Sequence, residues 1–145
     1  MSPSTPRAIV ERLLRLTAEG PSEGMADVFA EDAVFEMPFL PPGAPQPEPG
    51  REAFRAHLKA AVGVQEFDSV DDVHIHETAD PEVVVAEYRL HGRVVATGKR
   101  FASRIVMVAR IRAGVIVWSR SYSNPLDAVI AFDAVHDLLA GLTTA

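Results

Sequence analysis

Residues 99–124 read KRFASRIVMVARIRAGVIVWSRSYSN, and this stretch decides the fold. Two long runs rich in β-branched residues, 99–112 and 115–124, flank Ala113 and Gly114, a pair typical of a short hairpin turn. The hydrophobic period in both runs is two residues, as it is in strands that have two different faces. The stretch therefore predicts the last two strands of an antiparallel sheet.

The sequence on either side of this hairpin extends the pattern. Two more strands are predicted over 67–78 and 82–91, joined by a tight turn at 79–81. A short strand is predicted over 32–37, where DAVFEM alternates. Apolar residues recur instead at helical spacing in four segments: 6–19, 22–30, 51–62 and 126–139.

Most of the predicted helices precede the long strands, and this order predicts an α+β domain. One face of the sheet must pack on the helices, and a strongly bent sheet leaves a cavity between the two layers. A length of 145 residues fits a single domain over 1–145.

The segment 38–50, PFLPPGAPQPEPG, holds six of the 11 prolines. Proline fixes φ and removes a backbone donor, so this segment is neither a helix nor a central strand. We expect a stiff loop that forms the rim of the pocket.

Composition excludes several classes of function. The formal net charge is −6, whereas nucleic-acid binding needs a basic surface, so no nucleic-acid partner is expected. The chain has no cysteine, which rules out disulfides, thiolate zinc sites and cysteine nucleophiles. No apolar run reaches the roughly 20 residues that span a membrane, and the N-terminus does not have the form of a signal peptide. We therefore expect no membrane partner and a cytoplasmic location.

Four stretches of the chain resemble the nuclear-transport-factor-2-like superfamily. They are ADVFAEDAVFEMP at 26–38, GREAFRAHL at 50–58, the block at 80–93 that begins DP and ends EYRLHGR, and IRAGVIVWSRSYSNPL at 111–126. That superfamily includes SnoaL-type polyketide cyclases, ketosteroid isomerases, limonene epoxide hydrolases and the phenazine-biosynthesis A/B proteins, and the last branch is the closest in motif. The resemblance implies a cone-shaped fold, in which a curved sheet packs on three to four helices around a pocket. It also implies a small apolar or cyclic ligand, no cofactor, and a homodimer formed through the sheet.

The chain departs from these relatives at their catalytic positions. Ser121 stands where the phenazine branch has an acidic residue in the final strand, and Leu58, next to His57, stands where that branch has a helix histidine. The aspartate that often ends this strand in SnoaL-like cyclases matches Ser123 or Asn124. The final strand offers no carboxylate, so catalytic groups have to be sought elsewhere.

Glu87 and His57 are the candidate catalytic residues. Glu87 is the only acid within the apolar run VVVAEYRL, where burial would suit a carboxylate to general acid–base work. The alternative for Glu87 is an ion pair with Arg104 or Arg120 on a neighbouring strand. His57 borders the apolar stripe of the predicted helix 51–62 and could move a proton near neutral pH, or it could be a surface histidine.

Four further residues are considered for polar roles. Arg104 and Arg120 lie in the long strands and could bind a substrate carboxylate with two parallel hydrogen bonds. They could equally complete a cross-strand charge ladder or sit at a dimer contact. His74 and His76 are two residues apart on one strand and share a face, but no third ligand is evident, so no metal site is predicted.

Large apolar side chains near the predicted pocket are candidate ligand contacts, because aromatic walls suit a ring-shaped ligand. The alternative is that they only fill the core. The candidates are Phe35, Met37, Phe39, Phe54, Leu58, Trp118 and Tyr122, together with Ser121. In the last strand Trp118, Arg120 and Tyr122 alternate with three serines, and either set could face the pocket, because a single bulge reverses the alternation.

Two functions fit this sequence best. The first is a cofactor-free acid–base enzyme of the isomerase, cyclase or condensation type, acting on a small apolar cyclic metabolite in secondary metabolism, with Glu87 as base or acid and His57 as its proton partner. The alternative is a non-catalytic small-molecule-binding or accessory protein on the same fold. A purely structural dimerisation module with a filled interior is a weaker third possibility.

Overall fold

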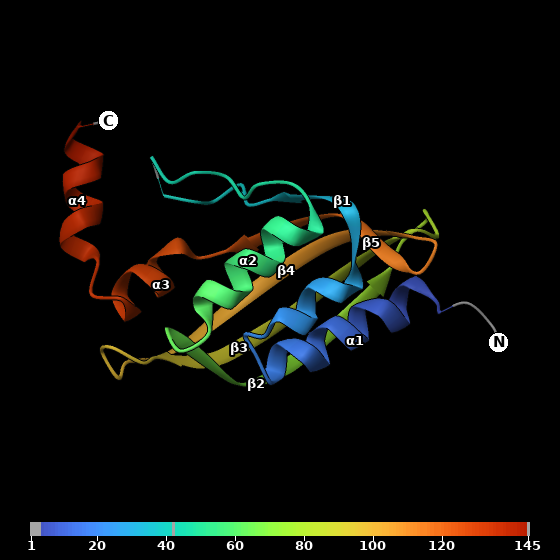
Figure 1. The fold of residues 1–145 in the computed structure, drawn as a ribbon, viewed down its shortest axis with the longest axis horizontal. Coiled ribbons are helices and arrows are strands. Elements are labelled where there is room, and N and C mark those ends of the chain that lie inside the picture. The colour runs from blue at the N-terminus through green and yellow to red at the C-terminus, as the bar shows by residue number, and fades with distance from the viewer. Residues whose placement is uncertain (1–3, 42, 145) are drawn as a thin grey trace.

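A five-stranded sheet forms the centre of the computed structural model, which describes residues 4–41 and 43–144 (Figure 1). The strands lie in the order β1-β5-β4-β3-β2. Neighbours among the last four are antiparallel, whereas β1 runs parallel to β5. The strands are β1 Phe29–Glu36, β2 Gln65–Glu77, β3 Val83–Val94, β4 Arg100–Arg112 and β5 Val115–Ser123. The predicted α+β class is confirmed.

The helices lie on one face of the sheet and at one of its ends. In Figure 1, α1 and α2 lie across one face, while α3 and α4 stand beyond one end of the strands. The elements are α1 Pro6–Ala18, the 3₁₀ helix η1 Glu23–Val28, α2 Arg51–Ala61, α3 Pro125–Ala131 and α4 Val135–Thr144. In the described part of the chain, no helix is long and apolar enough to cross a membrane.

The single closing helix predicted over 126–139 is wrong, because the structure has two helices there. The chain turns between them at Asp133, whose φ is 56°. Aspartate enters this left-handed region more readily than most residues. The apolar residues continue on both sides of the turn, which is why the sequence pattern read as one helix.

The core lies between α1, η1, α2 and the face of the sheet that they cover, which we call the inner face. Phe29, Phe35 and Phe54 pack there as a triad, with ring centroids 5.0 Å apart in each pair. Phe29 is 4% exposed. Because β1 supplies two of these rings and α2 the third, the triad fixes α2 over the β1 edge of the sheet.

A β-bulge in β5 decides which side chains of that strand face inward. Arg110 of β4 pairs with Trp118, but the next residue, Ile111, pairs with Ile116, so Val117 is an extra residue in β5. Ile116 and Ser119 are consequently both buried although they are three positions apart. Beyond the bulge the serines face inward.

The opposite face, which we call the outer face, carries cross-strand ion pairs. Glu82 accepts hydrogen bonds from Arg112 at 3.0 Å and from Arg110 at 2.9 Å. These hydrogen bonds, of which the one from Arg112 has the larger effect, lower the pKa of Glu82 to about 2. The charged residues of this face are therefore paired with one another rather than presented to the inner face.

Truncating the aromatic triad should destabilise the fold strongly. We expect Phe29→Ala to lower the free energy of unfolding by about 3–5 kcal/mol, because it removes a buried ring and leaves a cavity. Urea titration followed by circular dichroism measures this. The matched control is Phe39→Ala, which removes a ring that is 58% exposed and should cost no more than about 0.5 kcal/mol. Equal losses in the two variants would contradict the assigned position of the core.

The ion pairs of Glu82 should make the free energy of unfolding depend on pH in the acidic range. The folded-state pKa of Glu82 is lowered to about 2 from an ordinary value of 4.5, so its stabilisation is present above about pH 4.5 and is lost as the pH falls towards 2. We expect wild type to be more stable than Glu82→Gln at pH 5 and the difference to shrink at about pH 3. Urea unfolding of both proteins across this range gives the difference directly. A constant difference would show that Glu82 is not held ionised in the folded state.

Candidate functional site

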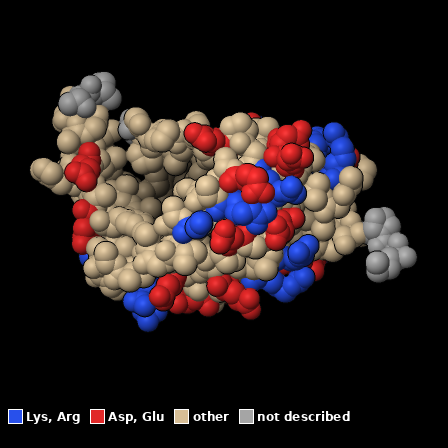
Figure 2. All heavy atoms as spheres, viewed as in Figure 1, with Lys and Arg blue, Asp and Glu red and all other residues tan. Residues whose placement is uncertain are grey.

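A pocket of about 310 Å³ opens between the inner face of the sheet, the loop after β1, and α3. In Figure 2 the surface is hollowed beside α3 and α4, and the atoms around this hollow are mostly uncharged. The volume lies at the lower end of the range typical of small-molecule sites, about 300–1,000 Å³. The lining residues are Met37, Phe39, Leu40, Pro41, Gln65, Phe67, Leu90, Phe101, Ser103, Ile105, Ser121, Ser123, Asn124, Pro125, Ala128, Val129 and Phe132.

The start of the proline-rich loop supplies one wall of the pocket, through Met37, Phe39 and the two residues that follow. The side chain of Gln46 holds this part of the loop, because its oxygen accepts from the Met37 N–H at 3.3 Å and its NH₂ donates to the Met37 carbonyl at 3.2 Å. Phe39 also packs edge-on against Tyr122, with ring centroids 5.4 Å apart. The segment expected to form the rim thus contributes to the pocket.

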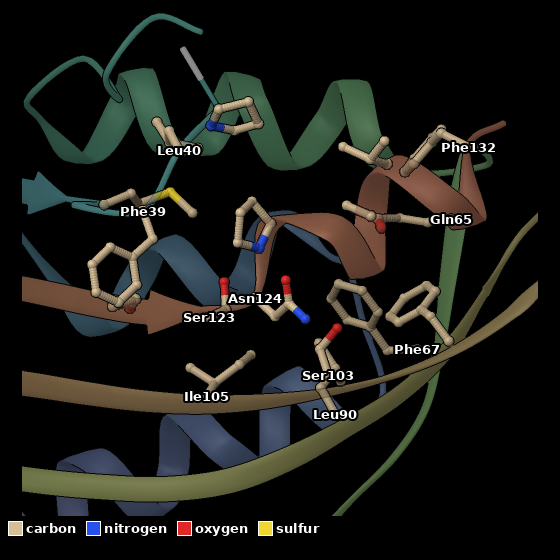
Figure 3. A pocket seen from close by; sticks show the side chains of 17 residues that line it. Phe39, Leu40, Gln65, Phe67, Leu90, Ser103, Ile105, Ser123, Asn124 and Phe132 are labelled. Atoms are coloured by element: carbon tan, nitrogen blue, oxygen red, sulfur yellow. The ribbon is translucent and has the colours of Figure 1, made fainter. Parts of the chain in front are cut away.

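Aromatic rings form the opposite wall. Phe67 of β2 and Phe101 of β4 meet edge to face, with ring centroids 6.4 Å apart, and Phe132 lies beyond α3 (Figure 3). Gly92 is in β3, which lies between β2 and β4. A Cβ at Gly92 would come within 2.7 Å of the Phe101 ring and 2.5 Å of the Glu66 carbonyl. The absence of a side chain at Gly92 is what lets Phe101 lie against the sheet.

Neutral polar groups enter the pocket from three elements. Gln65 comes from β2, Ser103 from β4, and Ser121 and Ser123 from β5. Figure 3 shows Ser103, Ser123 and Asn124 pointing into the same space. Within residues 4–41 and 43–144, no hydrogen bond joins the side chains of Gln65 or the three serines to another protein group. Their polar atoms are therefore available to a ligand.

Asn124 has two roles at the end of β5. Its Oδ1 accepts from the Leu126 N–H at 3.0 Å, which caps the first turn of α3. That bond leaves the NH₂ group as the end of the amide that can donate to a ligand.

The pocket wall is uncharged. No Asp, Glu, His, Lys or Arg occurs among the lining residues of the described chain. Tyr88 lies on the inner face of β3, opposite Ile105 of the pocket, but burial raises its pKa to about 12 and keeps the phenol neutral. The arrangement can donate and accept hydrogen bonds, but it presents no side chain of ordinary acid–base strength.

Three of the predicted ligand contacts line the pocket: Met37, Phe39 and Ser121. Phe35, Phe54 and Leu58 do not, because they pack into the core cluster under α2. The prediction that these three line the pocket is therefore wrong, and the alternative interpretation as core residues is the correct one.

The predicted burial of Glu87 is wrong. Its side chain is 51% exposed on the outer face, and its carboxylate lies 2.7 Å from His76 Nε2. The alternative, an ion pair with Arg104 or Arg120, is also wrong, because the contact of Glu87 is with His76 and the two arginines pair with Asp72 and Glu36. His57 is likewise exposed on α2 and does not line the pocket. Neither residue is placed to exchange a proton with a molecule in this pocket.

The two arginines also lie away from the pocket. Arg104 is 72% exposed and donates to Asp72 at 3.0 Å, while Arg120 donates to Glu36 at 2.6 Å. The guanidinium of Arg120 lies 4.9 Å from the centroid of the Trp118 ring. Trp118, Arg120 and Tyr122 were expected as ligand contacts, but the bulge at Val117 turns this set outward, so that prediction is wrong.

The histidine pair on β2 makes separate carboxylate contacts. His74 Nε2 lies 3.1 Å from Asp72, and His76 contacts Glu87. Across the described residues, no group of three or more His, Asp or Glu side chains is arranged to hold a metal ion.

Several lining residues were missed by sequence reasoning. Phe101, Ser103 and Ile105 alternate along β4, and Leu90 pairs with Ser103 from β3. A hydrophobic period of two shows that these residues share one face of the strand, but it does not show whether that face is the inner one. Gln65, Phe67 and Phe132 carried no signal, because they meet the pocket only through the curvature of the sheet and the turn after α3.

Comparison with known proteins identifies relatives over most of the chain. The family model described as the SnoaL-like domain matches residues 10–119. An uncharacterised PhzA/B-like protein of Pseudomonas aeruginosa is 33% identical over 132 residues, which cover 90% of this chain and 92% of that protein.

Two solved structures share the architecture. A Bacillus subtilis protein, provisionally described as an isomerase, superposes with a TM-score of 0.80 at 28% identity, over 87% of this chain and 91% of that one. A Pseudomonas putida protein, provisionally described as a polyketide cyclase, gives a TM-score of 0.72 at 17% identity, over 88% and 98%. The expected nuclear-transport-factor-2-like fold is confirmed. Because the family model spans most of the chain and the relative from Pseudomonas aeruginosa matches nine tenths of it, the chain belongs to the SnoaL-like family.

Proposed function

We propose that this protein binds a small, largely apolar cyclic molecule in the pocket between the inner face of the sheet, the loop after β1 and α3, without using a side-chain acid or base to transform it. The observation that carries the proposal is the lining itself, in which aromatic and aliphatic walls surround unpaired neutral polar groups. Apolar pockets with a few convergent polar groups are the usual form of a small-molecule site.

Each part of the lining has a separate role in binding. The rings of Phe67, Phe101 and Phe132 supply apolar area for a flat ligand. Ser103 and Ser123 can each donate one hydrogen bond and accept up to two, which would fix the orientation of a carbonyl or hydroxyl group. Leaving such a ligand atom without its partner costs affinity, so these serines should govern selectivity.

A second candidate is a cyclase or isomerase that works without a side-chain base. It is favoured by the provisional names of two similar proteins, one described as an isomerase and one as a polyketide cyclase, and by the cluster of neutral donors. Donors fixed near a carbonyl oxygen can stabilise negative charge that develops there, and a shaped pocket can hold a chain in a reactive conformation. In this version Ser103, Ser123 and the Asn124 NH₂ would be the charge-stabilising groups.

The homodimer through the sheet remains a prediction. Its contact would be the outer face, where Trp118 and Tyr122 are only half-buried among the ion pairs.

Filling part of the pocket should weaken ligand binding without unfolding the protein. We expect 2-naphthamide, an uncharged bicyclic ring with one amide, to bind wild type, as seen by ligand-observed NMR and calorimetry. Ser103→Leu should weaken this binding at least about tenfold, because it fills the site and removes a hydrogen-bonding group. The matched control is Ser69→Leu, the same change at an exposed position of β2 that pairs with His91. Equal weakening by both variants would exclude this pocket as the binding site.

Binding and acid–base catalysis can be separated by proton exchange. The ketone 2-tetralone exchanges its α-protons for deuterium in D₂O when it enolises, and ¹H NMR follows the loss of signal. A positioned general base accelerates such a step by roughly 10²–10⁴-fold. We expect no acceleration of that size here, because the described lining residues include no Asp, Glu, His or Lys.

An acceleration that disappears in Ser103→Leu would favour the second candidate over simple binding. An acceleration that disappears instead in Glu87→Gln or His57→Gln would return those exposed residues to the mechanism.

A further inference from the structure

We propose that the pocket selects uncharged ligands and rejects carboxylates of the same shape. This inference rests on the proposed function, because it concerns what the same pocket accepts. It goes further by naming the chemical class of the ligand as a neutral ring system that carries one or two carbonyl, amide or hydroxyl groups.

Among the residues that the structure describes, the polar groups that reach the pocket are all neutral. They are two amides, Gln65 and Asn124, and the hydroxyls of Ser103, Ser121 and Ser123. An amide or hydroxyl can satisfy one polar atom of a ligand with a hydrogen bond. It cannot supply the opposite charge that a carboxylate needs when it leaves water.

The nearest cations in the sequence are held on the other side of the sheet. Arg104 follows Ser103 directly, and Arg120 precedes Ser121, so strand alternation turns both guanidiniums to the outer face. Each is also occupied, Arg104 by Asp72 at 3.0 Å and Arg120 by Glu36 at 2.6 Å. Neither arginine is available to compensate a ligand anion in the pocket.

The surroundings add to the penalty for an anion. The rings of Phe67, Phe101 and Phe132 give the pocket an apolar wall, and apolar surface solvates an unpaired charge poorly. The formal net charge of the chain is −6, and its field disfavours the approach of a further negative charge. A neutral ligand of the same outline escapes both effects.

The test compares two isosteric probes, 2-naphthamide and 2-naphthoate, by calorimetry at pH 7. They share the ring and the planar side group, and they differ in charge. We expect the amide to bind at least about tenfold more tightly than the carboxylate, since burying an unpaired charge costs far more than burying a hydrogen-bonded neutral group.

Two variants separate charge from shape. Gln65→Lys places a cation in the pocket wall and should bring the affinity for 2-naphthoate up to or above that for 2-naphthamide. Ser69→Lys makes the same charge change outside the pocket, at an exposed position of β2, and should leave the preference for the amide unchanged.

The outcomes distinguish this inference from the function on which it rests. Binding of neither probe would overturn the proposed binding function and the inference with it. Equal binding of both probes, or tighter binding of 2-naphthoate, would overturn the selection of neutral ligands while leaving the binding function intact. A preference for the amide that Gln65→Lys does not reduce, or that Ser69→Lys reduces equally, would also overturn it, because charge in the pocket would then not be its cause.

Discussion

The extra residue at Val117 in β5 is the constraint on which the character of the pocket depends. Side chains alternate along a strand, so one inserted residue exchanges the two faces for every position that follows. With the bulge, Ser119, Ser121 and Ser123 face the helices. Without it, Trp118, Arg120 and Tyr122 would do so, and the pocket would hold a guanidinium and two large rings. A single backbone irregularity thus separates a neutral cavity from a charged one.

The separation of charge between the two faces of the sheet follows from this alternation. The outer face holds Arg104 with Asp72, Arg120 with Glu36, and His76 with Glu87. Exposed pairs of this kind add little stability one by one. Their importance for the site is that they leave the inner face to apolar side chains, neutral hydroxyls and amides, and a phenol that burial keeps protonated. Chemistry in such a pocket has to come from shape and hydrogen bonding.

The fold was predictable from the sequence to a much greater extent than the site. The hydrophobic periods of 3.6 and 2 residues locate the helices and strands to within a few residues. They do not reveal the turn at Asp133, because apolar residues continue on both sides of it. The prediction that large apolar side chains contact the ligand was correct for Met37 and Phe39, which lie where β1 leads into the proline-rich loop. Glu87 was misjudged because VVVAEYRL reads as a strand buried on both faces, whereas only alternate residues face the core. No sequence pattern around Ser103 indicates a ligand contact. Ser103 lines the pocket only because the folded chain brings β4 next to α3.

The wall formed by the proline-rich loop lies outside the core. Phe39 is 58% exposed, and the Gln46 amide ties the start of the loop to the backbone of Met37. None of these three residues belongs to the core cluster around Phe29 and Phe54. Exchanges in this loop can therefore reshape the ligand space while the scaffold keeps its stability. Substitutions at a few loop positions would therefore change which ligand fits, while the five-stranded sheet and its core helices stay unaltered.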